Sequence, residues 1–178
     1  GFNLANVGFW LPAIFGPLSA LPLVLLGWRE GQPEAGLTAG VVTGGCLGYL
    51  LRTRLGFADT DVLVLFFAVA VACGLLAWLT LICRSAWRPT ANPDSSDPPK
   101  IAFFLAAALG IGLIVQGYKW FFGDIQIALA LCGMALVLGL IFFSSRHGLR
   151  LLILGFMVLL ASGFGGWLGL AVGLAVVT

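Results

Sequence analysis

Apolar residues form six long runs, which are separated by short groups of charged residues. The charge-free runs cover residues 1–28, 35–51, 62–83, 101–118, 125–145 and 151–178. A helix rises about 1.5 Å per residue, so a span across the bilayer needs about 20 apolar residues. Four of the runs reach this length, and 101–118 reaches it when the aromatic residues after it are counted as an interfacial end. The pattern predicts an all-α fold, a polytopic transmembrane helical bundle with about six spans.

The run 35–51 is the shortest, and it suits either a full span through a thin region or a re-entrant segment. The clearly polar stretch 84–100 is rich in Pro, Ser and Asp, which predicts a solvated linker. This linker divides the chain into an N-terminal membrane half, 1–83, and a C-terminal membrane half, 101–178. Three spans in each half is an arrangement typical of proteins built from two related halves. The two halves share no sequence similarity beyond their glycine pattern.

Composition places these runs in a bilayer. The chain is 61% hydrophobic and only 9% charged, and its mean hydropathy is +1.10. Soluble domains are about 25% charged. The net charge of +2 is too small to indicate nucleic-acid binding. Lys and Arg are more frequent in the odd-numbered loops and the linker, which predicts that these face the cytoplasm of a bacterial inner (plasma) membrane. With six spans both termini lie outside, whereas they lie on opposite sides if 35–51 does not cross.

Glycines four residues apart recur in two of the apolar runs. The first set is Gly36, Gly40, Gly44 and Gly48, and the second is Gly165, Gly169 and Gly173. Residues at this spacing share one face of a helix, and in a bilayer small residues let two helix backbones pack closely. The spacing predicts glycine-zipper packing at both faces, within the chain or with a membrane protein partner subunit or a second copy of the chain.

A few polar or helix-breaking residues are candidates for a substrate path. Pro12, Pro17 and Pro22 lie in the first run, where each removes a backbone donor and predicts a kinked or broken helix. Such a helix either lines a transport site or packs against its neighbours. Gln116 is the best polar candidate, followed by Thr43. The Gln116 amide either touches a substrate or, as we favour, ties two helices together.

The familiar signatures of enzymes and metal sites are absent from the sequence. No charged residue lies at the centre of an apolar run, and the sole histidine, His147, lies in a short loop between two arginines. The four cysteines form no CxxC pair, and no HExxH, GxSxG or P-loop motif occurs. The sequence therefore predicts no metal, no cofactor and no enzymatic activity.

Two classes of function remain. The broken first run, the glycine-lined helices and the 3+3 layout favour an integral membrane subunit of a transport system, which moves a small solute or supports a larger transport subunit. The order of spans is loosely similar to that of small membrane subunits of tripartite carboxylate transporters, although no diagnostic motif of that family is present. The alternative is a non-catalytic structural or accessory subunit of a larger membrane complex, which the many packing faces favour.

Overall fold

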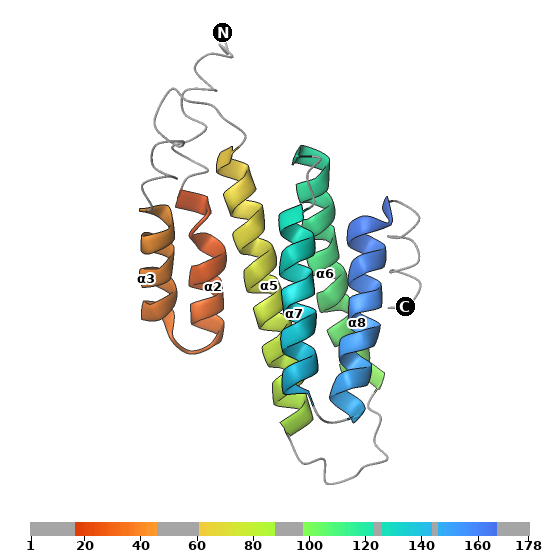
Figure 1. The fold of residues 1–178 in the computed structure, drawn as a ribbon. Coiled ribbons are helices and arrows are strands. Elements are labelled where there is room, and N and C mark those ends of the chain that lie inside the picture. The colour runs from red at the N-terminus through yellow and green to blue at the C-terminus, as the bar shows by residue number, and fades with distance from the viewer. Residues whose placement is uncertain (1–16, 46–60, 88–97, 123–125, 144–145, 167–178) are drawn as a thin grey trace. The chain divides into compact units, whose positions relative to one another are not determined.

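The computed structural model describes residues 17–45, 61–87, 98–122, 126–143 and 146–166 (Figure 1). The helices of these ranges are α2 (Leu21–Arg29), α3 (Pro33–Gly44), α5 (Asp61–Trp87), α6 (Pro98–Phe122), α7 (Gln126–Phe142) and α8 (Arg146–Phe164). No strand occurs within the described ranges. The predicted all-α fold is therefore confirmed.

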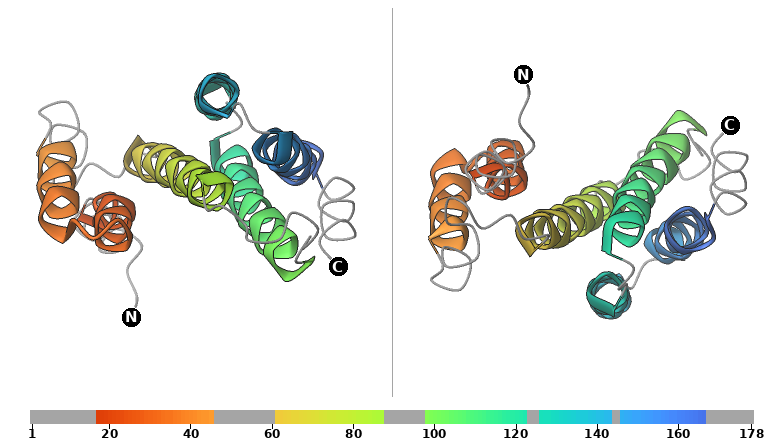
Figure 2. Two further views of the ribbon diagram at one scale, coloured as in Figure 1. Left: turned by 90° about the horizontal axis from the view of Figure 1, so that it is seen from below. Right: turned by 90° about the horizontal axis from the view of Figure 1, so that it is seen from above.

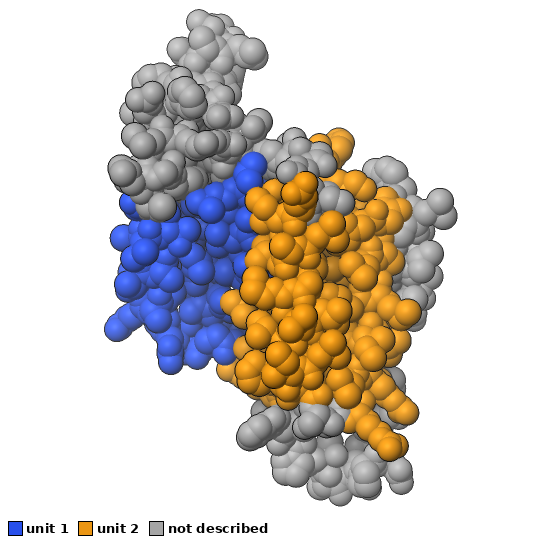
Figure 3. Space-filling view, viewed as in Figure 1, with its two compact units in different colours: residues 1–73 blue, residues 74–178 orange. Residues whose placement is uncertain are grey.

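The chain packs as two compact units, residues 1–73 and 74–178, which Figure 3 colours separately. The boundary between the units falls inside α5, whereas the two expected membrane halves are separated by the linker 84–100. The two units are defined by contacts between residues and not by the number of helices that cross a membrane. The division into three spans in each half therefore stays a prediction.

Two of the helices in the described ranges are long and apolar enough to cross a membrane. The segments are Leu63–Arg84 in α5, with 22 residues, and Ile101–Trp120 in α6, with 20 residues. At about 1.5 Å per residue both reach the roughly 30 Å of a bilayer core. Shorter apolar helices occupy Gln126–Phe142 and Gly148–Phe164. Length and composition thus support a helical membrane protein, while the number of six spans stays a prediction.

Unit 1 contains a tight hairpin of α2 and α3, which lie side by side (Figures 1 and 2). Gly31 turns the chain between them with a φ of 77°, a conformation that glycine adopts without strain. Pro22 stands in the first turn of α2, where its missing N–H costs no helical hydrogen bond. At Pro22 the chain therefore begins α2, directly after a turn at residues 19–20 that separates α2 from the helical residues 17–18, as expected of a broken helix.

Missing side chains set the distance between α2 and α3. A Cβ atom added at Gly36 would lie 2.7 Å from the carbonyl oxygen of Leu23 and 2.9 Å from the Cα of Gly27. A Cβ added at Gly40 would lie 2.9 Å from the Cβ of Ala20. Atoms of a real side chain do not fit at these distances, so the backbones can touch only because both positions are glycine.

We expect Gly36→Ala to destabilise the hairpin by about 1–3 kcal/mol, because the added methyl group meets backbone atoms that cannot rotate away. The matched control is Gly44→Ala in the same helix, since nothing among the described residues lies within 4 Å of a Cβ at Gly44. Thermal unfolding of both variants in mild detergent measures the difference. Equal melting temperatures for the two variants would contradict the observed packing.

In unit 2, α6 and α8 form the most extensive helix pair, and they lie side by side in both views of Figure 2. Gly112 of α6 faces Ser162 of α8, and a Cβ at Gly112 would overlap the Ser162 hydroxyl. One turn further along α6, Val115 approaches Gly163, where an added Cβ would lie 3.1 Å from the Val115 side chain. Both helices therefore contribute a glycine to the interface, and each glycine receives a side chain of the other helix.

Trp78 joins α5 to this pair. Its side chain is 1% exposed, and its indole Nε1 donates a 3.1 Å hydrogen bond to the backbone oxygen of Phe104 in α6. The same ring lies against Gly155 and packs on Phe156 of α8, with ring centroids 5.7 Å apart. A single large side chain thus connects three helices, with its polar atom satisfied and its apolar surface covered.

We expect Gly155→Ala to lower the free energy of unfolding by about 1–3 kcal/mol, because the new methyl group would overlap the Trp78 ring. Gly133→Ala in α7 is the matched control, since a Cβ there meets nothing within 4 Å among the described residues. Tryptophan fluorescence during thermal unfolding reports both stability and the environment of the ring. An unchanged unfolding midpoint for Gly155→Ala would contradict the contact between the Trp78 ring and Gly155.

Candidate functional site

Gln116 carries a buried polar atom in the apolar part of α6. Its Oε1 atom is buried and has no hydrogen-bond partner among the described residues, although the whole side chain is half-buried. A buried acceptor without a partner costs about 1–3 kcal/mol. No neighbouring helix in the described part of the chain supplies a bond to this oxygen. The atom is therefore an available acceptor, either for a ligand or for a further protein segment.

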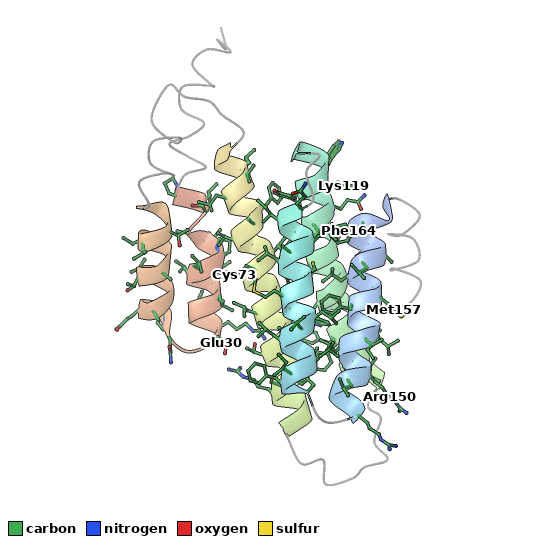
Figure 4. The ribbon with its side chains drawn as sticks, in the orientation of Figure 1. Glu30, Cys73, Lys119, Arg150, Met157 and Phe164 are labelled. Atoms are coloured by element: carbon green, nitrogen blue, oxygen red, sulfur yellow. The ribbon has the colours of Figure 1, made fainter. Side chains whose placement is uncertain are left out.

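Lys119 lies one turn after Gln116 and links the ends of two helices. Its Nζ donates a 3.4 Å hydrogen bond to the backbone oxygen of Phe164, the last residue of α8 (Figure 4). The last carbonyl groups of a helix have no partner within the helix and carry partial negative charge, so a cation is favourable there. Lys119 and Gln116 together form the polar end of the α6–α8 pair.

The other candidates for a substrate path belong to unit 1 or are not described. Thr43 is half-buried near the end of α3, and Pro17 is exposed four residues before α2. Pro22 lies in the first turn of α2, and Pro12 lies outside the described residues. Since Gln116 belongs to unit 2, the structure does not assemble these residues into one site, and the path stays a prediction.

The zipper glycines have different surroundings. Gly36 and Gly40 lie against α2, whereas a Cβ at Gly44 would meet nothing within 4 Å among the described residues. Gly165 is exposed just after α8. The remaining three, Gly48, Gly169 and Gly173, lie outside the described residues. Of the glycines that the four-residue spacing picks out, the structure therefore places two, Gly36 and Gly40, at a contact between helices.

Sequence reasoning missed the glycines that pack unit 2. They are Gly74, Gly112, Gly139, Gly155 and Gly163, each of which faces a side chain of another helix. None of them belongs to a run of glycines four residues apart, so the spacing criterion passes over them. A sequence shows a glycine, but not the bulky side chain that comes to lie against it.

The described residues offer no cluster for metal chemistry. No group of three or more His, Cys, Asp or Glu side chains that could hold a metal ion occurs among them. Cys73 and Cys132 are buried free thiols, and Cys83 is half-buried. Cys46 and the side chain of His147 lie outside what the structure describes.

Comparison with known proteins identifies the family. Residues 1–177 match the model of the N-terminal part of the oligosaccharyl transferase STT3. The chain belongs to the STT3 family. A relative from Methanocaldococcus jannaschii, a dolichyl-phosphooligosaccharide-protein glycotransferase, is 32% identical over 122 residues. The match covers 65% of this chain but only 12% of the relative, so the chain spans a small part of the relative's length. No solved structure matches the chain.

Membership in the STT3 family corrects the functional predictions. The expected membrane subunit of a transport system, and equally the non-catalytic accessory subunit, are wrong, because the family and the relative are named for a transferase that acts in glycosylation. The similarity to tripartite carboxylate transporters rested only on the order of spans, which unrelated polytopic proteins can share. The expectation of an integral membrane protein is confirmed.

The prediction that the chain has no enzymatic role is also wrong. It depended on motifs of hydrolases, metalloproteases and nucleotide-binding proteins, whose spacing reflects particular folds. Absence of those motifs excludes those families and no others. It also depended on the lack of a charged residue at the centre of an apolar run, which does not bear on charged groups at the ends of the runs or between them.

We expect Gln116→Met, which removes the amide and nearly keeps the volume, to leave the unfolding free energy unchanged or to raise it by about 1 kcal/mol, because the buried Oε1 accepts no bond from the described residues. Trp78→Phe is the contrasting variant, since it removes a donor that is bonded to Phe104. Thermal unfolding in the same detergent compares them. A loss for Gln116→Met as large as that for Trp78→Phe would reveal a protein partner for Gln116.

Proposed function

We propose that this STT3-family chain forms part of the membrane domain of an oligosaccharyl transferase, which transfers an oligosaccharide from a dolichyl-phosphate carrier to a protein. The observation that carries the proposal is the match to the STT3 family over residues 1–177. The name of the relative from Methanocaldococcus jannaschii supports the class of donor and acceptor. Since the chain spans a small part of that relative, the activity and its substrates are proposed here for the protein to which these helices belong.

The helices suit an enzyme whose donor is dissolved in the membrane. α5 and α6 present large apolar side chains on their outer faces, such as Leu76, Phe103 and Leu113, which are 48%, 59% and 47% exposed. In water such faces would drive aggregation, while in a bilayer they are solvated by lipid chains. A transferase held in this way meets a lipid-borne donor by diffusion within the membrane. In this proposal, the described helices anchor the enzyme in the bilayer and position it toward its donor.

The side of the membrane is part of the same proposal. We propose that the linker 84–100 faces the cytoplasm, because Arg84, Arg88 and Lys100 lie in or beside it and positive residues are retained on that side. The argument holds for the plasma membrane of a bacterium, as expected from the sequence, and for that of an archaeon such as the organism of the relative.

The test is transfer itself. We expect membranes that contain the protein to transfer oligosaccharide from a dolichyl-phosphate-linked donor to an acceptor peptide, as measured by mass spectrometry of the peptide. Gly112→Ala should lower this rate about tenfold, since the methyl group would overlap Ser162 and displace α6 from α8. Gly110→Ala is the matched control two residues away, where a Cβ meets nothing within 4 Å among the described residues. Absence of transfer by the wild-type protein would overturn the proposal.

A further inference from the structure

Two arginines stand at an unfavourable place in α8. Arg146 and Arg150 lie one turn apart in its first residues, and both side chains are exposed. Side chains at this spacing share a helix face, where like charges repel. The N-terminus of a helix carries partial positive charge, which disfavours cations further. The first turn of α8 contains no acidic residue, and neither arginine is paired within the described residues.

Among the described residues, the charged side chains at this end of unit 2 are of one sign. Successive helices of the unit run in opposite directions, so α5 ends where α8 begins (Figure 1). Arg84, also exposed, lies near that end of α5. Figure 4 shows Arg150 extending outward at the end of α8 that is opposite to Lys119 and Phe164. The described residues of unit 2 include no acidic side chain, so an anion that offsets this charge would have to come from outside them.

An apolar stripe continues from the arginines along the same face of α8. Ile153, Leu154 and Met157 follow Arg150 at helical spacing and are 50%, 43% and 65% exposed. Positions i, i+3, i+4 and i+7 share one helix face. The face therefore offers cationic groups at one end and about two turns of uncovered apolar surface beyond them. A molecule with an anionic head and an apolar chain matches both parts in this order.

We propose that Arg146 and Arg150 bind the phosphate of an anionic phospholipid, whose acyl chain lies along Ile153, Leu154 and Met157. A guanidinium group is planar and can donate two parallel hydrogen bonds to phosphate oxygens. A phosphate at this place is also favoured by the partial positive charge of the N-terminus of α8, and it offsets the repulsion between the two arginines. The inference does not depend on the transferase activity proposed above, because it concerns lipid retention alone.

The experiment measures retention of phosphatidylglycerol by the purified protein, with native mass spectrometry over a lipid titration. We expect binding to phosphatidylglycerol and little binding to zwitterionic phosphatidylcholine. The double variant Arg146→Gln/Arg150→Gln should bind phosphatidylglycerol about tenfold more weakly, since each basic residue near an anionic surface contributes severalfold. Arg29→Gln, which removes an exposed arginine in unit 1, is the matched control and should bind as the wild type does.

A further variant and a competition measurement distinguish a specific lipid site from general charge attraction and from a site for free phosphate. Arg146→Lys/Arg150→Lys keeps the charge but not the planar donors, and should bind with intermediate affinity. Equal binding by the wild type and the double glutamine variant would overturn the proposal. So would an equal loss in Arg29→Gln, which would indicate general charge attraction, or displacement of the lipid by excess inorganic phosphate, which would indicate a site for the free ion. Melting temperatures establish that each variant remains folded.

Discussion

Helices of this chain touch where one of them lacks a side chain. In a bilayer, apolar side chains gain little by leaving lipid for protein, so helix association depends on close van der Waals packing and on hydrogen bonds. The contact between Gly36 and Gly27 in unit 1 and the contact of Gly112 with Ser162 in unit 2 meet this condition in two ways. In the first, backbone meets backbone. In the second, a small polar side chain fills the space that the glycine leaves.

Polar groups inside such a bundle follow a second constraint, since no water is present to satisfy them. The Ser162 hydroxyl bonds to the backbone oxygen of Val158 at 2.8 Å, within its own helix. The Trp78 indole bonds to a backbone oxygen of the neighbouring helix. Gln116 departs from this rule, because its Oε1 remains without a partner in the described residues. Gln116 is therefore the residue at which a ligand or a further protein segment could supply the missing hydrogen bond.

The sequence predicts the helical class well and the contacts poorly. The charge-free runs 62–83 and 101–118 lie within α5 and α6, because charge exclusion from a bilayer acts on each residue independently of its neighbours. Packing is a relation between two surfaces, and Gly36 and Gly44 show the difference. They belong to one regular series, yet a Cβ at the first meets backbone and a Cβ at the second meets nothing among the described residues. Conversely, Gly155 belongs to no series and receives the Trp78 ring.

Function was harder to predict for a related reason. Motif reasoning assigns chemistry from reacting side chains, whereas the family of this chain joins membrane helices to an enzymatic reaction. The contribution proposed for the helices is a place in the bilayer and an orientation for the enzyme. Features such as the exposed apolar face of α6 and the arginines at the start of α8 are not examined by a search for reacting groups or metal ligands. The apolar centres of the helices indicate a lipid surrounding and no particular reaction, because any polytopic membrane protein needs such segments.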